Sequence, residues 1–211
     1  MKGKKYLTLL AAICIFSYFM MVNSGASTLD ENKHTYDKIP QEETIKTNIY
    51  DYRDLYEKAL IDFTKEISGL EYDLCKFLVV ECRENHLDPF LVLGLIKRES
   101  DFNPKAVGAG GELGLGQLME NTARVIAENL GYAYEHEMLL DPEFNLKLTI
   151  TQLSYLKNLY EDDLHKVLTA YNRGQQGLRN YLKTYNERGI SDYSSKVLQY
   201  ATDFKEEFRK R

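Results

Sequence analysis

Apolar residues recur at helical spacing along most of the chain from residue 49 onwards. The first such stretch ends before Gly69, and its apolar positions are Ile49, Tyr52, Leu55, Tyr56, Leu60, Phe63 and Ile67. Positions three and four residues apart share one face of an α-helix, so the pattern predicts an amphipathic helix at 49–69. Residues 27–48 are polar and have no apolar period, which is typical of a linker.

Further helices are predicted downstream by the same spacing and by capping signals. Asp88-Pro89 and Asp141-Pro142 each supply an N-cap followed by a proline in the first helical position. No stretch alternates between apolar and polar residues as a strand does. The predicted fold class is therefore mainly α, with helices at 70–85, from 89, from 121 or 122 to 131, from 142, from 164 to 174, and twice more at the C-terminal end, the last near Ser191.

The helix that follows Asp88-Pro89 carries the first candidate for chemistry. It is apolar on nearly every side from Phe90 to Ile96, so we expect it to be buried. Glu99 follows Leu95 by four residues and Ile96 by three, which puts its carboxyl group on the apolar face. Burial and the negative end of the helix dipole both disfavour the carboxylate, and should raise the pKa of Glu99. A carboxylic acid that is protonated near neutral pH suits a general acid.

Three motifs follow one another in the chain, beginning at this glutamate. They are Glu99-Ser100-Asp101-Phe102-Asn103-Pro104, Gly114-Leu115-Gly116-Gln117 and Ala170-Tyr171-Asn172-Arg173-Gly174. In order and spacing they resemble the soluble lytic transglycosylase family, which reads E-S-x-F-N-P, G-L-M-Q and A-Y-N-x-G. The resemblance extends over residues 70–205. It implies a lysozyme-like helical domain with a cleft, similar in fold to goose-type lysozymes.

The resemblance also implies a reaction and its residues. Lytic transglycosylases cleave the β-1,4 bond between N-acetylmuramic acid and N-acetylglucosamine in peptidoglycan and form a 1,6-anhydromuramoyl product. Glu99 would be the single general acid and base, because the substrate's own N-acetyl group stabilises the developing charge. The resemblance implies substrate-binding roles for Ser100, Gln117, Tyr171 and Asn172. It implies no cofactor.

Two residues depart from the family pattern. Gly116 stands where the family usually has methionine, which would remove a side chain from the cleft lining. Arg173 stands where a small residue is common after the Tyr-Asn pair. We expect both departures to alter subsites and to leave the reaction type unchanged.

Two other functions stay open. A muramidase would hydrolyse the same bond, but it needs a second carboxylate to activate water. Asp101, Glu112 and Glu120 are the candidates, of which Glu112 lies in the Gly-rich loop that runs from Gly108 to Gly116. A wall-binding assembly component of a secretion or conjugation machine would use the fold without needing an acid at Glu99.

Charge, cysteine spacing and histidine positions argue against a nucleic-acid partner, a disulfide and a metal site. The formal net charge is −5 and no basic stripe lies between the chain ends, so we expect no nucleic-acid partner. Cys75 and Cys82 are seven residues apart on one predicted helix, about 10 Å between Cα atoms, too far for a disulfide. We expect two buried free thiols. The four histidines do not cluster, so we expect no metal site.

The N-terminal segment is typical of an exported protein. Lysines in residues 1–5 precede an apolar run at 6–22, and small residues follow it. Residues 1–26 are predicted to be a signal peptide, cleaved after Ala26, or a retained membrane anchor with the domain outside. The predicted divisions are then 1–26, the polar linker 27–48, an accessory helix 49–69 and a catalytic domain 70–211. The expected partners are peptidoglycan glycan strands. A cell-envelope protein complex is considered as an additional partner.

Overall fold

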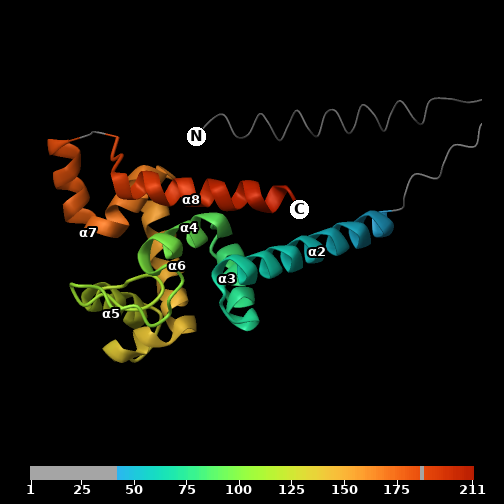
Figure 1. Cartoon of the computed structure of the whole chain (residues 1–211), viewed down its shortest axis with the longest axis horizontal. Helices are drawn as coiled ribbons and strands as arrows, with labels where there is room; N and C mark the ends of the chain where they lie inside the picture. Colours follow the sequence, from blue (N-terminus) through green and yellow to red (C-terminus); the bar gives the residue numbers. More distant parts are fainter. Residues whose placement is uncertain (1–41, 186–187) are drawn as a thin grey trace, which may run out of the picture. The chain divides into compact units, whose positions relative to one another are not determined.

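The computed structural model describes residues 42–185 and 188–211, with side chains from Tyr52 onwards. Within these residues there is no strand, and two isolated β-bridges close the loop around Leu113. The prediction of a mainly α fold is confirmed. The elements (Figure 1) are α2 (Glu42–Ser68), α3 (Tyr72–Glu84), α4 (Pro89–Ser100), α5 (Glu120–Asn129), the 3-10 helix η1 (His136–Leu140), α6 (Pro142–Leu159), α7 (Leu164–Thr184) and α8 (Asp192–Arg209).

Residues Thr44–Arg211 form one compact unit. The apolar run 6–22, the predicted cleavage site after Ala26 and the linker as far as residue 41 lie outside the described residues. Among the helices of residues 42–185 and 188–211, none combines the length and apolarity that crossing a membrane requires.

The helix starts predicted from capping signals are confirmed. The side chain of Asp88 accepts a hydrogen bond from the Phe90 amide at 3.0 Å, and Asp141 accepts one from the Phe144 amide at 2.8 Å. Each of these aspartates precedes a proline in the first turn. These bonds satisfy amides that the helix itself leaves without a partner.

Helix α2 begins at Glu42, earlier than the predicted start at residue 49. The predicted start relied on the apolar spacing, which begins at Ile49, but a helix can extend into polar residues that show no such spacing. The last residues of the predicted linker are therefore helical.

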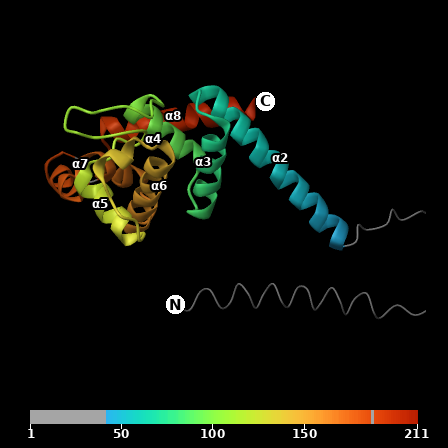
Figure 2. The same cartoon turned by 90° about the horizontal axis from the view of Figure 1, so that it is seen from below.

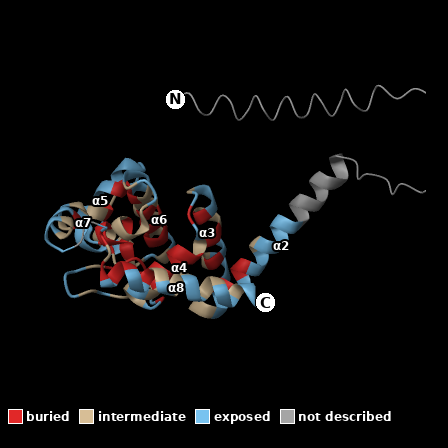
Figure 3. Cartoon of the chain, turned by 90° about the horizontal axis from the view of Figure 1, so that it is seen from above, coloured by how far each residue is buried: buried red, intermediate tan, exposed pale blue. Residues whose placement is uncertain are grey.

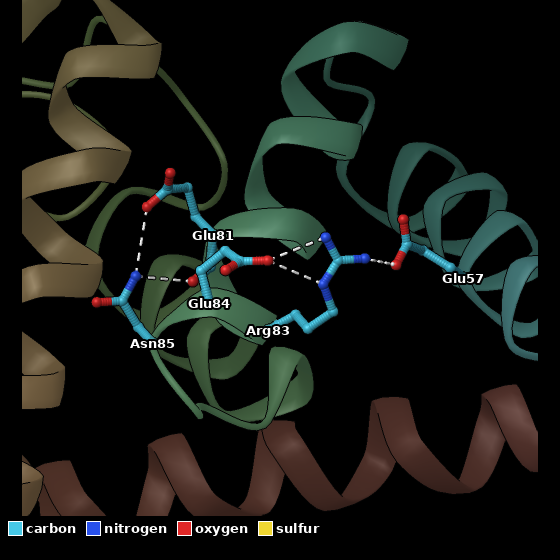
Figure 4. Close-up of polar contacts among 5 residues, drawn as sticks. All are labelled: Glu57, Glu81, Arg83, Glu84 and Asn85. Atoms are coloured by element: carbon cyan, nitrogen blue, oxygen red, sulfur yellow. Dashed lines mark hydrogen bonds and ion pairs between the residues drawn. The ribbon is translucent and has the colours of Figure 1, made fainter.

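The C-terminal half of α2 packs against the rest of the unit. Phe63 is buried, with ring centroids 6.2 Å from Phe90 and 5.4 Å from Phe208. On α3, Arg83 forms ion pairs with Glu57 of α2 and with its neighbour Glu84 (Figure 4). Earlier on α2, Tyr52 is 74% exposed, and Figure 3 shows this part of the helix as solvent-facing. Packing onto the domain, one of the two roles considered for this helix, thus holds for its C-terminal half.

Helix α4 is the buried centre of the unit, and α8 lies alongside it in Figures 1 and 2. Every residue of α4 from Phe90 to Ile96 is buried, as predicted. At Gly94 the backbones approach so closely that a Cβ atom would lie 2.6 Å from the carbonyl oxygen of Val197. This approach requires glycine. It also brings the first turn of α8 beside the last turn of α4, where Glu99 lies.

A second, smaller apolar cluster lies under the Gly-rich loop. Its buried members come from that loop, α5, η1 and α6: Leu113, Leu118, Ala123, Ile126, Ala127, Leu139 and Leu148. Cys75 and Cys82, both on α3, are free and buried in the main cluster, as predicted. Burial raises the pKa of both thiols, so they act as small apolar residues.

Candidate active site

A cleft of about 1030 Å³ opens beside the end of α4. Its walls come from α4, the Gly-rich loop, α5, α6 and the middle of α7. Four of the predicted site residues line it, and they are Glu99, Gln117, Tyr171 and Asn172. The other lining residues are Gly108, Ala109, Glu112, Leu118, Met119, Asn121, Thr122, Val125, Ile126, Asn129, Leu130, Thr151, Gln152, Tyr155, Ala170, Arg173, Gly174 and Gln175.

Glu99 places its carboxyl group in the lining of this cleft, and its environment favours the protonated form. Burial raises the pKa of Glu99, and the negative charge of Glu112 adds to that rise. A hydrogen bond from Tyr193 and the positive charge of Arg98 act in the opposite direction, without cancelling the effect of burial. The rise predicted from the apolar face of the helix is confirmed, with burial as its main cause.

Tyr193 is a site residue that the sequence reasoning missed. Its hydroxyl donates a hydrogen bond to Oε1 of Glu99, and its side chain is 8% exposed. Burial and the nearby Glu99 charge raise the pKa of Tyr193 well above its usual value, so the phenol stays protonated and remains a donor. The guanidinium of Arg98 lies over the same ring, 5.7 Å from its centroid. Ser191, the N-cap of α8, is the sequence signal that places Tyr193 in the first turn of that helix.

The backbone turns sharply where α4 ends. Asp101 and Phe102 both have left-handed φ angles, 52° and 63°, and Phe102 is nevertheless buried. A bulky residue in this conformation is held there by its surroundings. The Ser100 hydroxyl lies 2.8 Å from the Leu115 carbonyl oxygen and 3.2 Å from that of Ile96. Ser100 therefore ties α4 to the Gly-rich loop and is not part of the cleft lining.

Gln117 directly follows the Gly-rich loop and has a left-handed φ of 46°. Its amide nitrogen donates to the carbonyl oxygens of Ala106, at 3.1 Å, and Gly114, at 2.9 Å. An amide NH₂ group has two hydrogens, so both are used inside the loop. The carbonyl oxygen of Gln117 is the group left for a ligand. The side chain thus offers an acceptor, where the sequence suggested both a donor and an acceptor.

Asn145 on α6 holds the Gly-rich loop from below, and sequence reasoning gave it no role. It is fully buried; its Nδ2 donates to the carbonyl oxygens of Leu113 and Leu139, at 2.9 and 3.0 Å, and its Oδ1 accepts from the Gly116 amide at 2.8 Å. All of its polar atoms are therefore satisfied by backbone. Together with the Ser100 hydroxyl, this side chain positions the loop next to Gln117.

Gly116 occupies a place with no room for a side chain. A Cβ atom there would lie 2.0 Å from Oγ1 and 2.8 Å from Cγ2 of Thr149, a buried residue of α6. Gly116 is itself buried and is not among the lining residues. The departure from the family pattern at this position is thus filled from α6, and it does not open a gap in the cleft wall.

Tyr171 and Asn172 come from α7, just before that helix breaks. Gly174 has φ 69° and ψ 164°, which confirms the predicted helix end there, and a second helical segment then continues to Thr184. The Tyr171 hydroxyl donates to the Gly116 carbonyl oxygen at 2.8 Å. It therefore braces the loop and does not donate to Glu99, one of the two partners considered for it. Asn172 is exposed to the cleft.

The candidates for a second carboxylate differ in position. Glu112 lines the cleft, where Oε2 accepts a hydrogen bond from the Gly110 amide at 2.9 Å. Asp101 forms an ion pair with Lys97, and Glu120 forms one with Arg124. Both are exposed and outside the lining. Within the described part of the chain, no group of three or more His, Cys, Asp or Glu side chains could hold a metal ion.

Lytic murein transglycosylases are among the known proteins that this chain resembles. Membrane-bound lytic murein transglycosylase C of Photorhabdus laumondii is 36% identical over 98 residues, which cover 42% of this chain and 28% of the relative. A putative soluble lytic murein transglycosylase of Haemophilus influenzae is 27% identical over 112 residues, 52% of this chain and 19% of that protein. The chain thus matches less than a third of the length of these relatives.

Solved structures show the same fold. An inactive mutant of lytic transglycosylase Slt from Pseudomonas aeruginosa has a TM-score of 0.56 at 25% identity, over 63% of this chain and 24% of that one. The 70 kDa soluble lytic transglycosylase of Escherichia coli has a TM-score of 0.58 at 18% identity, over 81% and 31%. The predicted lysozyme-like helical fold is confirmed. The model of the transglycosylase SLT domain matches residues 80–194, more than half of the sequence. The chain belongs to the transglycosylase SLT domain family.

Proposed function

We propose that this protein is a peptidoglycan lytic transglycosylase in which Glu99 is the single general acid and base. The observation that carries the proposal is the environment of Glu99. Its carboxyl group lines the cleft, burial raises its pKa, and a buried phenol donates to it. The family membership supports the same reaction, and the printed names of the relatives are those of lytic murein transglycosylases.

The proposed reaction moves one proton at each of two stages. Glu99 first donates its proton to the oxygen of the β-1,4 bond between N-acetylmuramic acid and N-acetylglucosamine, and the bond from the anomeric carbon to that oxygen breaks. The N-acetyl group of the same muramic acid stabilises the charge at the anomeric carbon. The Glu99 carboxylate then takes the proton from the C6 hydroxyl, whose oxygen bonds to the anomeric carbon. The product is the 1,6-anhydro sugar, and Glu99 is again protonated.

The surroundings of Glu99 suit a group that must be both acid and base. Burial favours the protonated form that the first stage uses. The hydroxyl of Tyr193 stabilises the carboxylate that the first stage leaves behind, because a hydrogen bond to the charged form favours that form. Tyr193 is therefore proposed as a positioning residue that keeps the two forms close in free energy.

The other predicted site residues have different roles in this proposal. The free carbonyl oxygen of Gln117 suits the N–H of an N-acetyl group, and the exposed Asn172 amide suits a sugar hydroxyl. Tyr171 shapes the cleft floor through its bond to Gly116. For Ser100, whose hydroxyl contacts two backbone carbonyls, a contact with the sugar stays a prediction.

A hydrolytic muramidase is the second candidate, and one observation favours it. Glu112 lines the same cleft and its charge acts on Glu99, as a water-activating carboxylate in an inverting hydrolase would. The hydrogen bond that the Glu112 carboxylate accepts from the Gly110 amide instead suits a structural role, in which Glu112 stabilises the turn of its own loop. Of the other candidates, Asp101 is paired with Lys97 outside the cleft.

Two matched variants distinguish these functions. Glu99→Gln should abolish release of soluble fragments from purified peptidoglycan in either case, and unchanged release would end both proposals. Glu112→Gln should retain most of the rate if the protein is a transglycosylase, because no second carboxylate takes part. Loss of most of the turnover in Glu112→Gln would instead support the hydrolase. Thermal unfolding of each variant serves as the control for folding.

We also propose that the protein is exported to the cell envelope, either secreted or held by residues 6–22 as a membrane anchor. The basic and apolar composition of residues 1–22 supports export, and several relatives are named as membrane-bound. The divisions 1–26, 27–48, 49–69 and 70–211 remain part of this proposal, with the linker shortened by the early start of α2. Glycan strands are the proposed partner, and a cell-envelope protein complex remains an option.

A further inference from the structure

The charged residues that line the cleft are unevenly distributed. Glu99 and Glu112 supply two carboxyl groups, and Arg173 is the one Lys or Arg among the lining residues of the described chain. Arg173 is also a residue at which this sequence departs from the pattern of its family. It follows Asn172 directly and precedes the break at Gly174, so it projects from the last residues of the first segment of α7. The proposed reaction leaves this cation without a role.

The guanidinium of Arg173 is held in place by an aromatic ring. It lies over Tyr181, 5.1 Å from the ring centroid. Tyr181 is itself fixed, because its hydroxyl donates to the Ile190 carbonyl oxygen at 2.8 Å and its ring packs on Tyr185 with centroids 5.3 Å apart. Stacking on a ring uses the face of the guanidinium and leaves its N–H groups at the edge for a ligand. The charge is thus oriented before any substrate arrives.

A carboxylate is the group that this arrangement fits. The planar fork of arginine binds a carboxylate through two parallel hydrogen bonds. Arg173 carries the one positive charge among the lining residues of the described chain and Glu112 adds a negative one, so an anionic substituent is most favourable beside Arg173. Within peptidoglycan the sugar rings are neutral, and carboxylates belong to the lactyl substituent of muramic acid or to the stem peptide attached to it.

We propose that Arg173 is a specificity-determining residue that binds a carboxylate on the substituent of muramic acid, and so favours substrates that carry this anion over neutral glycan. This inference rests on the proposed function for the identity of the polymer. It adds a residue that recognises the substituent, in a cleft whose other proposed residues act on the sugars and the bond between them. The stem peptide and the free lactyl group are the two sources of the same chemistry.

Binding without turnover tests the proposal. The host is full-length Glu99→Gln protein, and the probes are oligomers of N-acetylglucosamine, glycan strands stripped of peptide, and strands that retain their stem peptides. The first probe has no carboxylate, the second has lactyl carboxylates only, and in the third the lactyl group is in amide linkage. Arg173→Gln should weaken binding of a carboxylate-bearing probe about tenfold, or ~1.4 kcal/mol, and change binding of the neutral oligomers less than about twofold. Raising the salt concentration should reduce the difference.

The matched control is Arg124→Gln. Arg124 also lies over a tyrosine ring, 4.9 Å from the centroid of Tyr134, but it is not part of the cleft lining. Arg124→Gln changes the net charge by the same amount as Arg173→Gln, and it should leave the affinities for all three probes unchanged. Arg173→Lys should recover part of the affinity, because it keeps the charge and loses the fork.

The pattern over the probes decides the outcome. A loss confined to strands with peptides assigns the carboxylate to the stem peptide, and a loss confined to stripped strands assigns it to the lactyl group. An equal loss for all three probes, or no loss for either anionic one, overturns the proposal. Cleavage by the unmodified protein is measured separately, so a failure of the proposed reaction is recognised from its products and not from these affinities.

Discussion

Replacing Tyr193 by phenylalanine should shift the pH dependence of the reaction upward. The change removes one hydroxyl, which donates to Oε1 of Glu99, and leaves the buried ring beneath Arg98. That hydrogen bond lowers the pKa of Glu99, in opposition to the effect of burial. Without it the carboxylate is less stable, so the pKa of Glu99 should rise further.

The size of the shift follows from the type of bond. A hydrogen bond to a charged group contributes about 1.5–3 kcal/mol, and about 1.36 kcal/mol corresponds to one pKa unit. Glu99 lines an open cleft, where water replaces part of the lost bond, so the lower end of the range applies. We expect an increase of about one unit in the pKa of Glu99.

The assay is the rate of release of soluble muropeptides as a function of pH, at limiting substrate. Glu99 must be protonated to begin the reaction, so the rate falls as pH rises through its pKa in the free enzyme. In Tyr193→Phe this falling limb should lie about one pH unit higher than in the unmodified protein. Tyr134→Phe is the matched control, because it removes a partly buried hydroxyl whose partner is His136, outside the cleft.

A falling limb that stays in place, or that moves to lower pH, would refute the assignment of this limb to Glu99 or the role of Tyr193. An equal shift in Tyr134→Phe would attribute the effect to a general loss of stability. A loss of rate at every pH with no shift would mean that Tyr193 only fixes the position of the carboxyl group.

Three further predictions concern stability. The pKa of Glu99 is raised in the folded state, so the stability that protonated Glu99 contributes is lost as pH rises from about 4.3 through the folded-state pKa. Glu99→Gln should therefore unfold at a higher denaturant concentration than the unmodified protein at neutral pH. The difference between the two proteins should vanish in acid. Asn145→Ala removes the side-chain partner of the Gly116 amide and of the Leu139 carbonyl oxygen, and one of the two donors to the Leu113 carbonyl oxygen, and should cost about 3 kcal/mol in urea unfolding. Gly116→Ala should cost about 1–3 kcal/mol through overlap with Thr149, and the double variant with Thr149→Gly should be at least about 1 kcal/mol more stable than the sum of the two single changes.

The parts of the site that local spacing determines could be predicted from the sequence. Glu99 belongs to one helix, and its distance from Leu95 and Ile96 along the chain fixes the face from which it emerges. The capped starts at Asp88 and Asp141 are equally local. The break at Gly174 follows from a single residue type, since its φ is positive.

The parts that depend on tertiary packing could not be predicted in this way. Tyr193 meets Glu99 across 94 positions of sequence, and their contact depends on the close approach of α4 and α8 at Gly94. Asn145 reads as an ordinary polar residue of a helix, although the fold buries it beneath the loop. The start of α2 was missed because its first turns carry polar residues, which give no apolar period.

The composition of the soluble products is the measurement that tests the central claim most directly. Purified peptidoglycan is digested with the protein, and the released muropeptides are identified by mass spectrometry. The one-carboxylate reaction of Glu99 predicts fragments that end in 1,6-anhydromuramic acid, each one water lighter than the product of hydrolysis. Fragments with a reducing muramic acid end would contradict it, and would mean that water is a reactant in this cleft.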